Sequence, residues 1–187
     1  MRQLKINLGL DISTSCTGYC LFDSDGRLID IGGIRLNSKK SLFSRVTDVS
    51  KVLSEVCEGK SIENIYIEEN LQAFRPGLSS AKTLLTLARF NGMISYEMYA
   101  MTGLDPVYVN VNAGRKLVGL KINRKSDLST KDQVYEWVRQ DLNKTNTNIE
   151  WPFKILKSGP RKGQKVLDTS AYDMSDAYVI CKAGMLL

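Results

Sequence analysis

The stretch LGLDISTSCTGYCLFDSDG (residues 8–26) joins an apolar strand directly to the carboxylate of Asp11. An ionised carboxylate that leaves water costs free energy unless it is paired or bound to a metal. Two explanations fit this position. Asp11 could open an Asx turn with the Ser-Thr-Ser that follows it, or the strand could hold the carboxylate for chemistry.

The chain around this stretch alternates strands and helices. Asp23-Ser24-Asp25-Gly26 predicts a hairpin turn, because glycine supplies a positive φ. The predicted strands are Ile6–Ile12, Gly18–Phe22, Leu28–Leu36, Asn64–Ile67 and Pro106–Val111. Apolar spacing and capping residues predict helices over Leu42–Val56, Ser79–Met101, Asn112–Val118, Ser129–Leu142 and Ser170–Met185. A strand meander followed by alternating elements predicts an α/β fold with a mixed sheet.

Length and composition favour one domain. The chain has 187 residues, of which 43% are hydrophobic and 25% charged, as in ordinary globular proteins. Residues 143–168 show little periodicity, and we expect an insertion or a mobile loop there. No apolar run is long enough to span a membrane, and the first strand begins too early for a signal peptide. We therefore expect a cytoplasmic protein of a bacterium, or of a phage in its host's cytoplasm.

The residue types that are missing narrow the chemistry. The chain contains no histidine, which excludes Ser-His-Asp and Cys-His catalysis. Its four cysteines lack the spacing of a metal site, and we expect buried free thiols. Any hydrolytic reaction must then depend on carboxylates, lysines or metal ions.

Positive charge is concentrated in two segments. The formal net charge is +6, and neither Pro106–Ser126 nor Pro152–Val166 contains an acid. Such segments are typical of surfaces that face phosphates, although solvated loops have the same composition. The candidate DNA-binding residues in them are Arg115, Lys116, Lys121, Arg124, Lys125, Lys157, Arg161 and Lys162.

Four acids stand at positions that favour a shared site. Asp11 and Glu68 end strands, at the edge where α/β sheets place their sites, and Asp173 and Asp176 share one face of the last helix. Carboxylates so close together require cations, and Mg²⁺ or Mn²⁺ prefers oxygen ligands. Two such ions about 4 Å apart can hydrolyse a phosphodiester without histidine.

Each acid also has a structural explanation, which the sequence leaves open. Glu68 and Glu69 could form a solvated strand end, and Ser170-x-x-Asp173 has the spacing of a capping box. Lys131, in the first turn of a predicted helix, could be an ordinary surface lysine.

These motifs together resemble the RuvC-type Holliday junction resolvases of the RNase H-like superfamily. LGLDISTSCTGYCLFD resembles their first motif, and IYIEENL resembles the second, in which the glutamate matches Glu68. STKDQVYEWV resembles the segment with an active-site lysine, which matches Lys131. YDMSDAYVI resembles the terminal helix motif and places its acids at Asp173 and Asp176.

The resemblance implies an RNase H-like fold, with a mixed five-stranded sheet flanked by helices, and a homodimer that nicks four-way DNA junctions using two metal ions per site. Asp11, Glu68, Asp173 and Asp176 would be both metal ligands and catalytic, with Lys131 assisting. The family aromatic that probes the junction falls at Leu71, and Phe74 is the nearby candidate for that role. The family's second basic residue near the site has no clean match, but Arg115 and Lys116 lie close to where it should be. The long helix at 81–99 resembles the family's dimerisation helix.

Three alternative functions can be compared with these residues. The nearest is another RNase H-like nuclease that acts on flaps, other branched DNA or RNA–DNA hybrids. An inactive junction-binding protein disagrees with the complete set of acids. An ATP-dependent actin-like kinase would need a second Asp-Gly-rich motif, which the sequence lacks.

Overall fold

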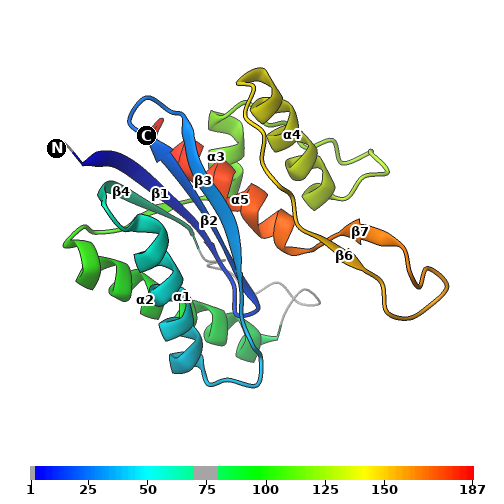
Figure 1. Ribbon diagram of the computed structural model, residues 1–187, viewed down its shortest axis with the longest axis horizontal. Coiled ribbons are helices and arrows are strands. Elements are labelled where there is room, and N and C mark those ends of the chain that lie inside the picture. Colours follow the sequence, from blue (N-terminus) through cyan, green and yellow to red (C-terminus); the bar gives the residue numbers. More distant parts are fainter. Residues whose placement is uncertain (1–2, 70–79) are drawn as a thin grey trace.

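The five-stranded sheet in Figure 1 organises the molecule, whose computed structural model describes residues 3–69 and 80–187. The strands lie in the order β3-β2-β1-β4-β5. β1, β2 and β3 form an antiparallel meander, whereas β4 and β5 run parallel to β1. The strands are β1 (Leu4–Ile12), β2 (Cys16–Asp23), β3 (Leu28–Arg35), β4 (Lys60–Glu68) and β5 (Val107–Val109). This mixed sheet confirms the predicted fold class.

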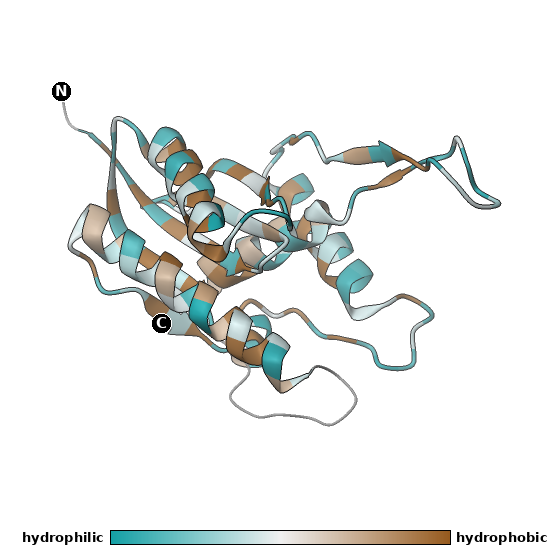
Figure 2. Cartoon of the chain, turned by 90° about the horizontal axis from the view of Figure 1, so that it is seen from below, coloured by the Kyte–Doolittle hydropathy of each residue, from teal (hydrophilic) through white to brown (hydrophobic). Residues whose placement is uncertain are grey.

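Helices cover both faces of the sheet (Figures 1 and 2). α1 and α2 pack on one face, and α3, α4 and α5 lie on the other. The helices are α1 (Leu42–Cys57), α2 (Ala81–Thr102), α3 (Val111–Leu117), α4 (Thr130–Lys144) and α5 (Ser170–Gly184). Within the described residues, no helix combines the length and apolar character needed to cross a membrane.

Alternation along β1 decides which side chains face which layer. Ile6, Leu8 and Leu10 are fully buried in the core beneath α1 and α2. Because successive strand residues point to opposite faces, Gly9 and Asp11 face α5. The period of two therefore directs the carboxylate away from the larger apolar core and toward the last helix.

Two glycines of the opening stretch allow α5 to approach the sheet. A Cβ atom at Gly18 would lie 2.0 Å from the carbonyl oxygen of Asp173, and one at Gly9 would lie 2.3 Å from Cβ of Cys181. Neither distance is possible for a real side chain, so only glycine fits at these positions. This packing holds the first turn of α5 against β2.

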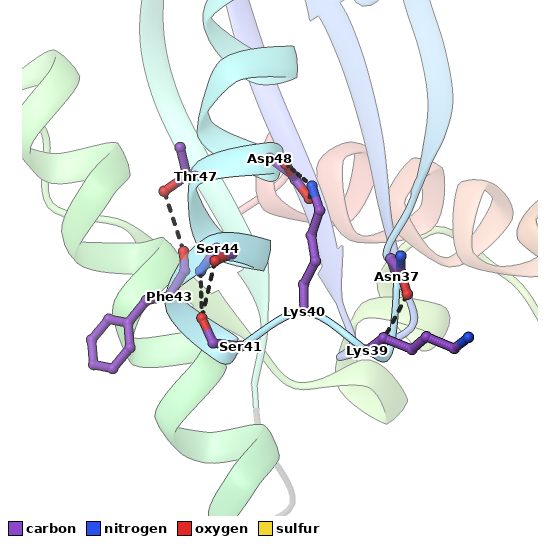
Figure 3. A network of polar contacts seen from close by, with 8 residues as sticks. All are labelled: Asn37, Lys39, Lys40, Ser41, Phe43, Ser44, Thr47 and Asp48. Atoms are coloured by element: carbon purple, nitrogen blue, oxygen red, sulfur yellow. Dashed lines mark hydrogen bonds and ion pairs between the residues drawn. The ribbon is translucent and has the colours of Figure 1, made fainter.

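Local capping explains where two helices begin. Ser41 caps α1 by accepting a 3.1 Å hydrogen bond from the Ser44 amide, and Lys40 pairs with Asp48 in the second turn (Figure 3). Ser129 caps α4, as predicted, by accepting a hydrogen bond from the amide of Asp132. Each bond satisfies a donor that the helix itself leaves unpaired.

The structure corrects several predicted boundaries and adds a hairpin. β4 begins at Lys60, because its polar first half pairs with β1 across a bulge between Ile6 and Asn7. β5 keeps only Val107–Val109, since Asn110 caps α3. The segment predicted to lack regular structure contains a hairpin of β6 (Phe153–Ile155) and β7 (Lys165–Leu167), which projects from the rest of the molecule in Figures 1 and 2. Its three-residue strands are too short to give a periodic signal.

The four cysteines, at positions 16, 20, 57 and 181, are all buried and free of disulfides. This confirms the prediction of buried thiols. Cys181 lies behind β1, where its Sγ is 3.4 Å from the carbonyl oxygen of Asn7.

Candidate active site

All five predicted catalytic residues line one cavity of about 430 Å³ at the carboxyl ends of β1 and β4. They come from four separate elements of the chain. The residues are Asp11, Glu68, Lys131, Asp173 and Asp176. We call this space the carboxylate cavity.

Strand register and helix period bring the four acids together. Leu10 pairs with Ile67 across the parallel strands β1 and β4, so the acids that follow them, Asp11 and Glu68, stand on adjacent strands. Both face α5, by the same alternation that buries Leu10 and Ile67 on the opposite face. Asp173 and Asp176 are three residues apart on α5 and therefore share the side of the helix that faces the strand ends.

Burial raises the pKa of each of the four carboxyls above its usual value. For Asp11 the rise is large, because the charges of Glu68, Asp176 and Asp173 and a hydrogen bond with Glu68 add to desolvation. The pKa of Glu68 is raised by desolvation and by the charge of Asp176. The pKa values of Asp173 and Asp176 are also raised, chiefly by desolvation. The cavity thus holds more negative charge than its surroundings stabilise.

Two cations oppose this rise. Arg115 on α3 donates from Nη2 to Oδ1 of Asp176 at 3.2 Å, and its side chain is only 16% exposed. Lys131, in the first turn of α4, is exposed, and its charge lowers the pKa values of Glu68 and Asp176. Its Nζ lies 5.9 Å from the ring centroid of Tyr172. A positive charge at the mouth of the cavity can also stabilise an incoming phosphate.

The donor set of the cavity fits Mg²⁺ or Mn²⁺. Among the residues that the structure describes, no three acidic, cysteine or histidine side chains are arranged to enclose a single ion. Mg²⁺ does not require such an enclosure, because it commonly binds one or two carboxylates and completes its shell with water and substrate phosphate. An open cavity of carboxylates with raised pKa values has both the oxygen ligands and the excess negative charge for that mode of binding.

Two of the structural explanations for the acids are wrong. Ser13 forms the side-chain hydrogen bonds of the turn after β1. Its Oγ accepts a hydrogen bond from the Cys16 amide at 3.1 Å and donates one to the Cys16 carbonyl oxygen at 2.7 Å. Asp11 is therefore not the residue that shapes the turn. The N-cap of α5 is Thr169, whose side chain makes no capping bond within the described chain, and the hydroxyl of Ser170 donates to Asp168 instead. Asp173 is thus not part of a capping box.

The predicted DNA-binding residues fall into three groups. Arg115 lies inside the carboxylate cavity rather than on the outer surface. Phe74, like Leu71, lies outside the described residues. The others are exposed, either at the end of α3 and in the segment before α4 or in the turn of the β6–β7 hairpin: Lys116, Lys121, Arg124, Lys125, Lys157, Arg161 and Lys162.

Asn91 is a residue of the cavity wall that the sequence analysis missed. It is 2% exposed, and its side-chain nitrogen lies 3.4 Å from the carbonyl oxygen of Glu68. Ser95 bonds to Asn91, and the Tyr108 hydroxyl donates to Ser95 at 2.9 Å. This chain of bonds ties α2 to the end of β4. The only signal in the sequence was an asparagine beside Phe90 on the buried side of a helix.

Comparisons with known proteins agree with this architecture. Neither protein-family sequence models nor curated protein sequences match the chain. Among solved structures, Thermus thermophilus RuvC in complex with a Holliday junction substrate superposes with a TM-score of 0.61 at 15% identity, covering 97% of this chain and 93% of that one. The chain has the RuvC fold. A second RuvC structure from Thermus thermophilus gives a TM-score of 0.56 at 14% identity.

The likeness also extends to a eukaryotic protein. The yeast mitochondrial Holliday junction resolvase Ydc2 has a TM-score of 0.57 and 16% identity, with 100% of this chain and 80% of that chain covered. At such low identity the likeness establishes the fold, and the function must be argued from the residues of the carboxylate cavity.

Proposed function

We propose that this protein is a metal-dependent endodeoxyribonuclease that resolves four-way DNA junctions by paired nicks. The observation that carries the proposal is the convergence of four carboxylates and Lys131 on one cavity within a RuvC fold. Phosphodiester hydrolysis on carboxylate-held ions needs no histidine, which agrees with a chain that contains none.

The metal ligands in this proposal are Asp11, Glu68, Asp173 and Asp176, which would hold two Mg²⁺ ions, with Mn²⁺ as a substitute. When bound, such ions activate water and stabilise the leaving oxygen. Arg115 orients Asp176 through their 3.2 Å ion pair. Lys131 would place its charge near the phosphate, where negative charge increases in the transition state.

Exposed basic residues would hold the DNA backbone on both sides of the cavity. One group extends from Lys116 to Lys125, between α3 and α4, and the other occupies the turn of the hairpin from Lys157 to Lys162. Each phosphate contact releases counterions, so the affinity for DNA should fall steeply with salt.

Paired nicks require two active sites, and we propose a homodimer formed by the face of α1 and α2. A groove of about 590 Å³ runs between these helices, with Phe43, Met93 and Tyr96 in its walls. Phe43 is 71% exposed and Tyr96 67%, and Figure 3 shows the Phe43 ring pointing away from α1. Sedimentation equilibrium would test this: Tyr96→Glu should yield monomers, and a wild-type monomer at micromolar concentration would contradict the dimer.

The test of the function is cleavage of a labelled four-way junction, with matched duplex, flap and RNA–DNA hybrid controls, in Mg²⁺ and in EDTA. Symmetric nicks on the junction that disappear in EDTA are expected. Asp11→Asn keeps the size of the side chain and should abolish cleavage while junction binding persists. Preferential cutting of flaps or hybrids would assign another RNase H-like activity, and cleavage that survives in Asp11→Asn would refute the proposed site.

A further inference from the structure

A second cavity, of about 470 Å³, borders the carboxylate cavity. The two share Lys131 and Asp173. The other wall of the second cavity carries Arg35 from the end of β3, Lys154 from β6 and Asp168 from the segment before α5. We call it the basic cavity, because three cations border it and Asp173 already belongs to the carboxylate cavity.

Asp168 fixes the geometry of the basic cavity. Its side chain is only 5% exposed, and its Oδ1 accepts hydrogen bonds of 2.9 Å from both the amide and the hydroxyl of Ser170. The same oxygen lies 2.7 Å from Nη2 of Arg35, and Oδ2 lies 3.7 Å from Nζ of Lys154. One buried carboxylate thus brings together a cation from the sheet and a cation from the projecting hairpin.

Both cations keep donors for another anion. Lys154 is 42% exposed and its Nζ is beyond hydrogen-bond distance of Asp168, so the ammonium retains its three donors for a closer acceptor. Arg35 is 58% exposed and reaches Asp168 and Ser170 through Nη2 alone, whereas a guanidinium carries five N–H donors. The 2.7 Å contact with Arg35 already pairs the buried carboxylate of Asp168, and an exposed lysine 3.7 Å away adds little to folding, so the pairing of Asp168 does not require Lys154.

We propose that Arg35 and Lys154, together with Lys131, bind the DNA phosphate next to the one that is cut. The strand would then continue from the carboxylate cavity into the basic cavity and on toward the hairpin, whose turn carries Lys157, Arg161 and Lys162. Asp168 is a positioning residue that docks the hairpin beside the active site. The inference rests on the proposed function only in taking DNA as the substrate.

The test is a binding experiment in EDTA that requires no cleavage. Neutral methylphosphonates replace single phosphates of a four-way junction, one position at a time, and dissociation constants are measured for each protein. The wild-type protein should bind the junction more weakly when the phosphate that occupies the basic cavity is replaced by a methylphosphonate. Arg35→Ala and Lys154→Ala should bind the unmodified junction more weakly. In these variants the methylphosphonate at that one position should no longer lower the affinity, because the substituted side chain and the phosphate are interaction partners whose effects are not additive.

Salt dependence supplies a second readout. Arg35→Ala and Lys154→Ala should each lower the magnitude of the slope of log affinity against log salt by about one unit. Lys154→Arg keeps the charge and should have the wild-type slope. Lys51→Ala removes the same charge from the exposed side of α1 and should leave the slope and the phosphate pattern unchanged. Asp168→Asn should weaken the sensitivity at the same phosphate, because the two cations lose their common partner.

The proposal is overturned if Arg35→Ala and Lys154→Ala lower the unfolding temperature but keep the wild-type salt slope and phosphate pattern. The residues would then only fasten the hairpin. Loss of sensitivity at many phosphates together would likewise overturn it, because that pattern indicates detachment of the whole hairpin. A protein that binds DNA with the predicted pattern but cuts no substrate would refute the proposed function and leave the phosphate site standing.

Discussion

Gly18→Ala tests whether the close approach of α5 to β2 builds the active site. The added Cβ would lie 2.0 Å from the carbonyl oxygen and 2.4 Å from the carbonyl carbon of Asp173. Ordinary contacts of a Cβ atom begin near 3.4 Å, so the two backbones must separate by about 1.4 Å, the difference between the two distances. Backbone atoms cannot rotate aside as a side chain would, and the displacement therefore moves Asp173 itself.

The expected effects differ for stability and for catalysis. Alanine in a strand is ordinarily favoured over glycine by about 0.5–1 kcal/mol, whereas overpacking costs about 1–3 kcal/mol. We expect a net loss of about 1–2 kcal/mol, or roughly 2–8 °C in the unfolding temperature of a chain of this length. Displacement of a catalytic group by about 1 Å can cost about 100-fold in rate, so kcat should fall far more than stability.

The assay combines thermal unfolding with single-turnover junction cleavage, both in Mg²⁺. Junction binding in EDTA verifies that the variant is folded at the assay temperature. Gly33→Ala is the matched control, because Gly33 pairs with Gly18 across β2 and β3 and its Cβ would lie 3.1 Å from Cβ of Ser170. A shift of a few tenths of an ångström removes that contact, and we expect cleavage close to the wild-type rate.

Two results would refute the reasoning. Gly18→Ala could cleave at the wild-type rate with an unchanged unfolding temperature, in which case the approach of α5 does not position Asp173. Equal losses of rate in Gly18→Ala and Gly33→Ala would instead indicate a general effect of alanine on these strands.

Three further predictions concern the charges in the carboxylate cavity. Asp11→Asn should raise the free energy of unfolding in EDTA, because burial and the charges of Glu68, Asp176 and Asp173 disfavour the ionised carboxylate; a less stable variant in urea unfolding would contradict this. The pKa values of Asp11, Glu68, Asp173 and Asp176 are raised in the folded protein, so their contribution to metal-free stability is fully present below pH about 4 and is lost as pH rises through the raised values. In urea unfolding with EDTA, the free energy of unfolding of Asp11→Asn should therefore increase relative to the wild type as pH rises. A difference that stays constant with pH would count against this. Lys131→Met should lower the single-turnover rate at saturating protein about 100-fold and should also weaken junction binding, because Lys131 borders both cavities; weaker binding with an unchanged rate at saturation would assign Lys131 to binding alone.

The elements that carry the acids could be predicted from contiguous sequence. Apolar alternation through Leu10 predicted a strand that ends at Asp11, and the same pattern through Ile67 predicted a strand end at Glu68. Spacing on the last helix put Asp173 and Asp176 on one face. These features depend on neighbours within a few positions, which a sequence displays directly.

The partners of those acids were decided only by tertiary structure. Arg115 stood in a basic segment that suggested outward-facing phosphate contacts, and the family resemblance placed it, with Lys116, only near a second basic residue of the site. It is turned inward and paired with Asp176, 61 residues away. Asn91 gave almost no signal, because its role depends on where α2 crosses the end of β4. The short strands of the hairpin were also missed, since their register is set by pairing such as Phe153 with Leu167 rather than by periodicity.

The sequence by itself determined the order of the strands and helices that form the main sheet and its two layers, the four acids and the absence of histidine. Tertiary structure alone decided that Arg35 and Lys154 meet at Asp168, beside the carboxylate cavity. The physical reason is that periodicity and turn chemistry act over a few residues. The ion pairs of a buried carboxylate depend instead on distances in space, and Arg35 and Asp168 come together only after the sheet and α5 have packed.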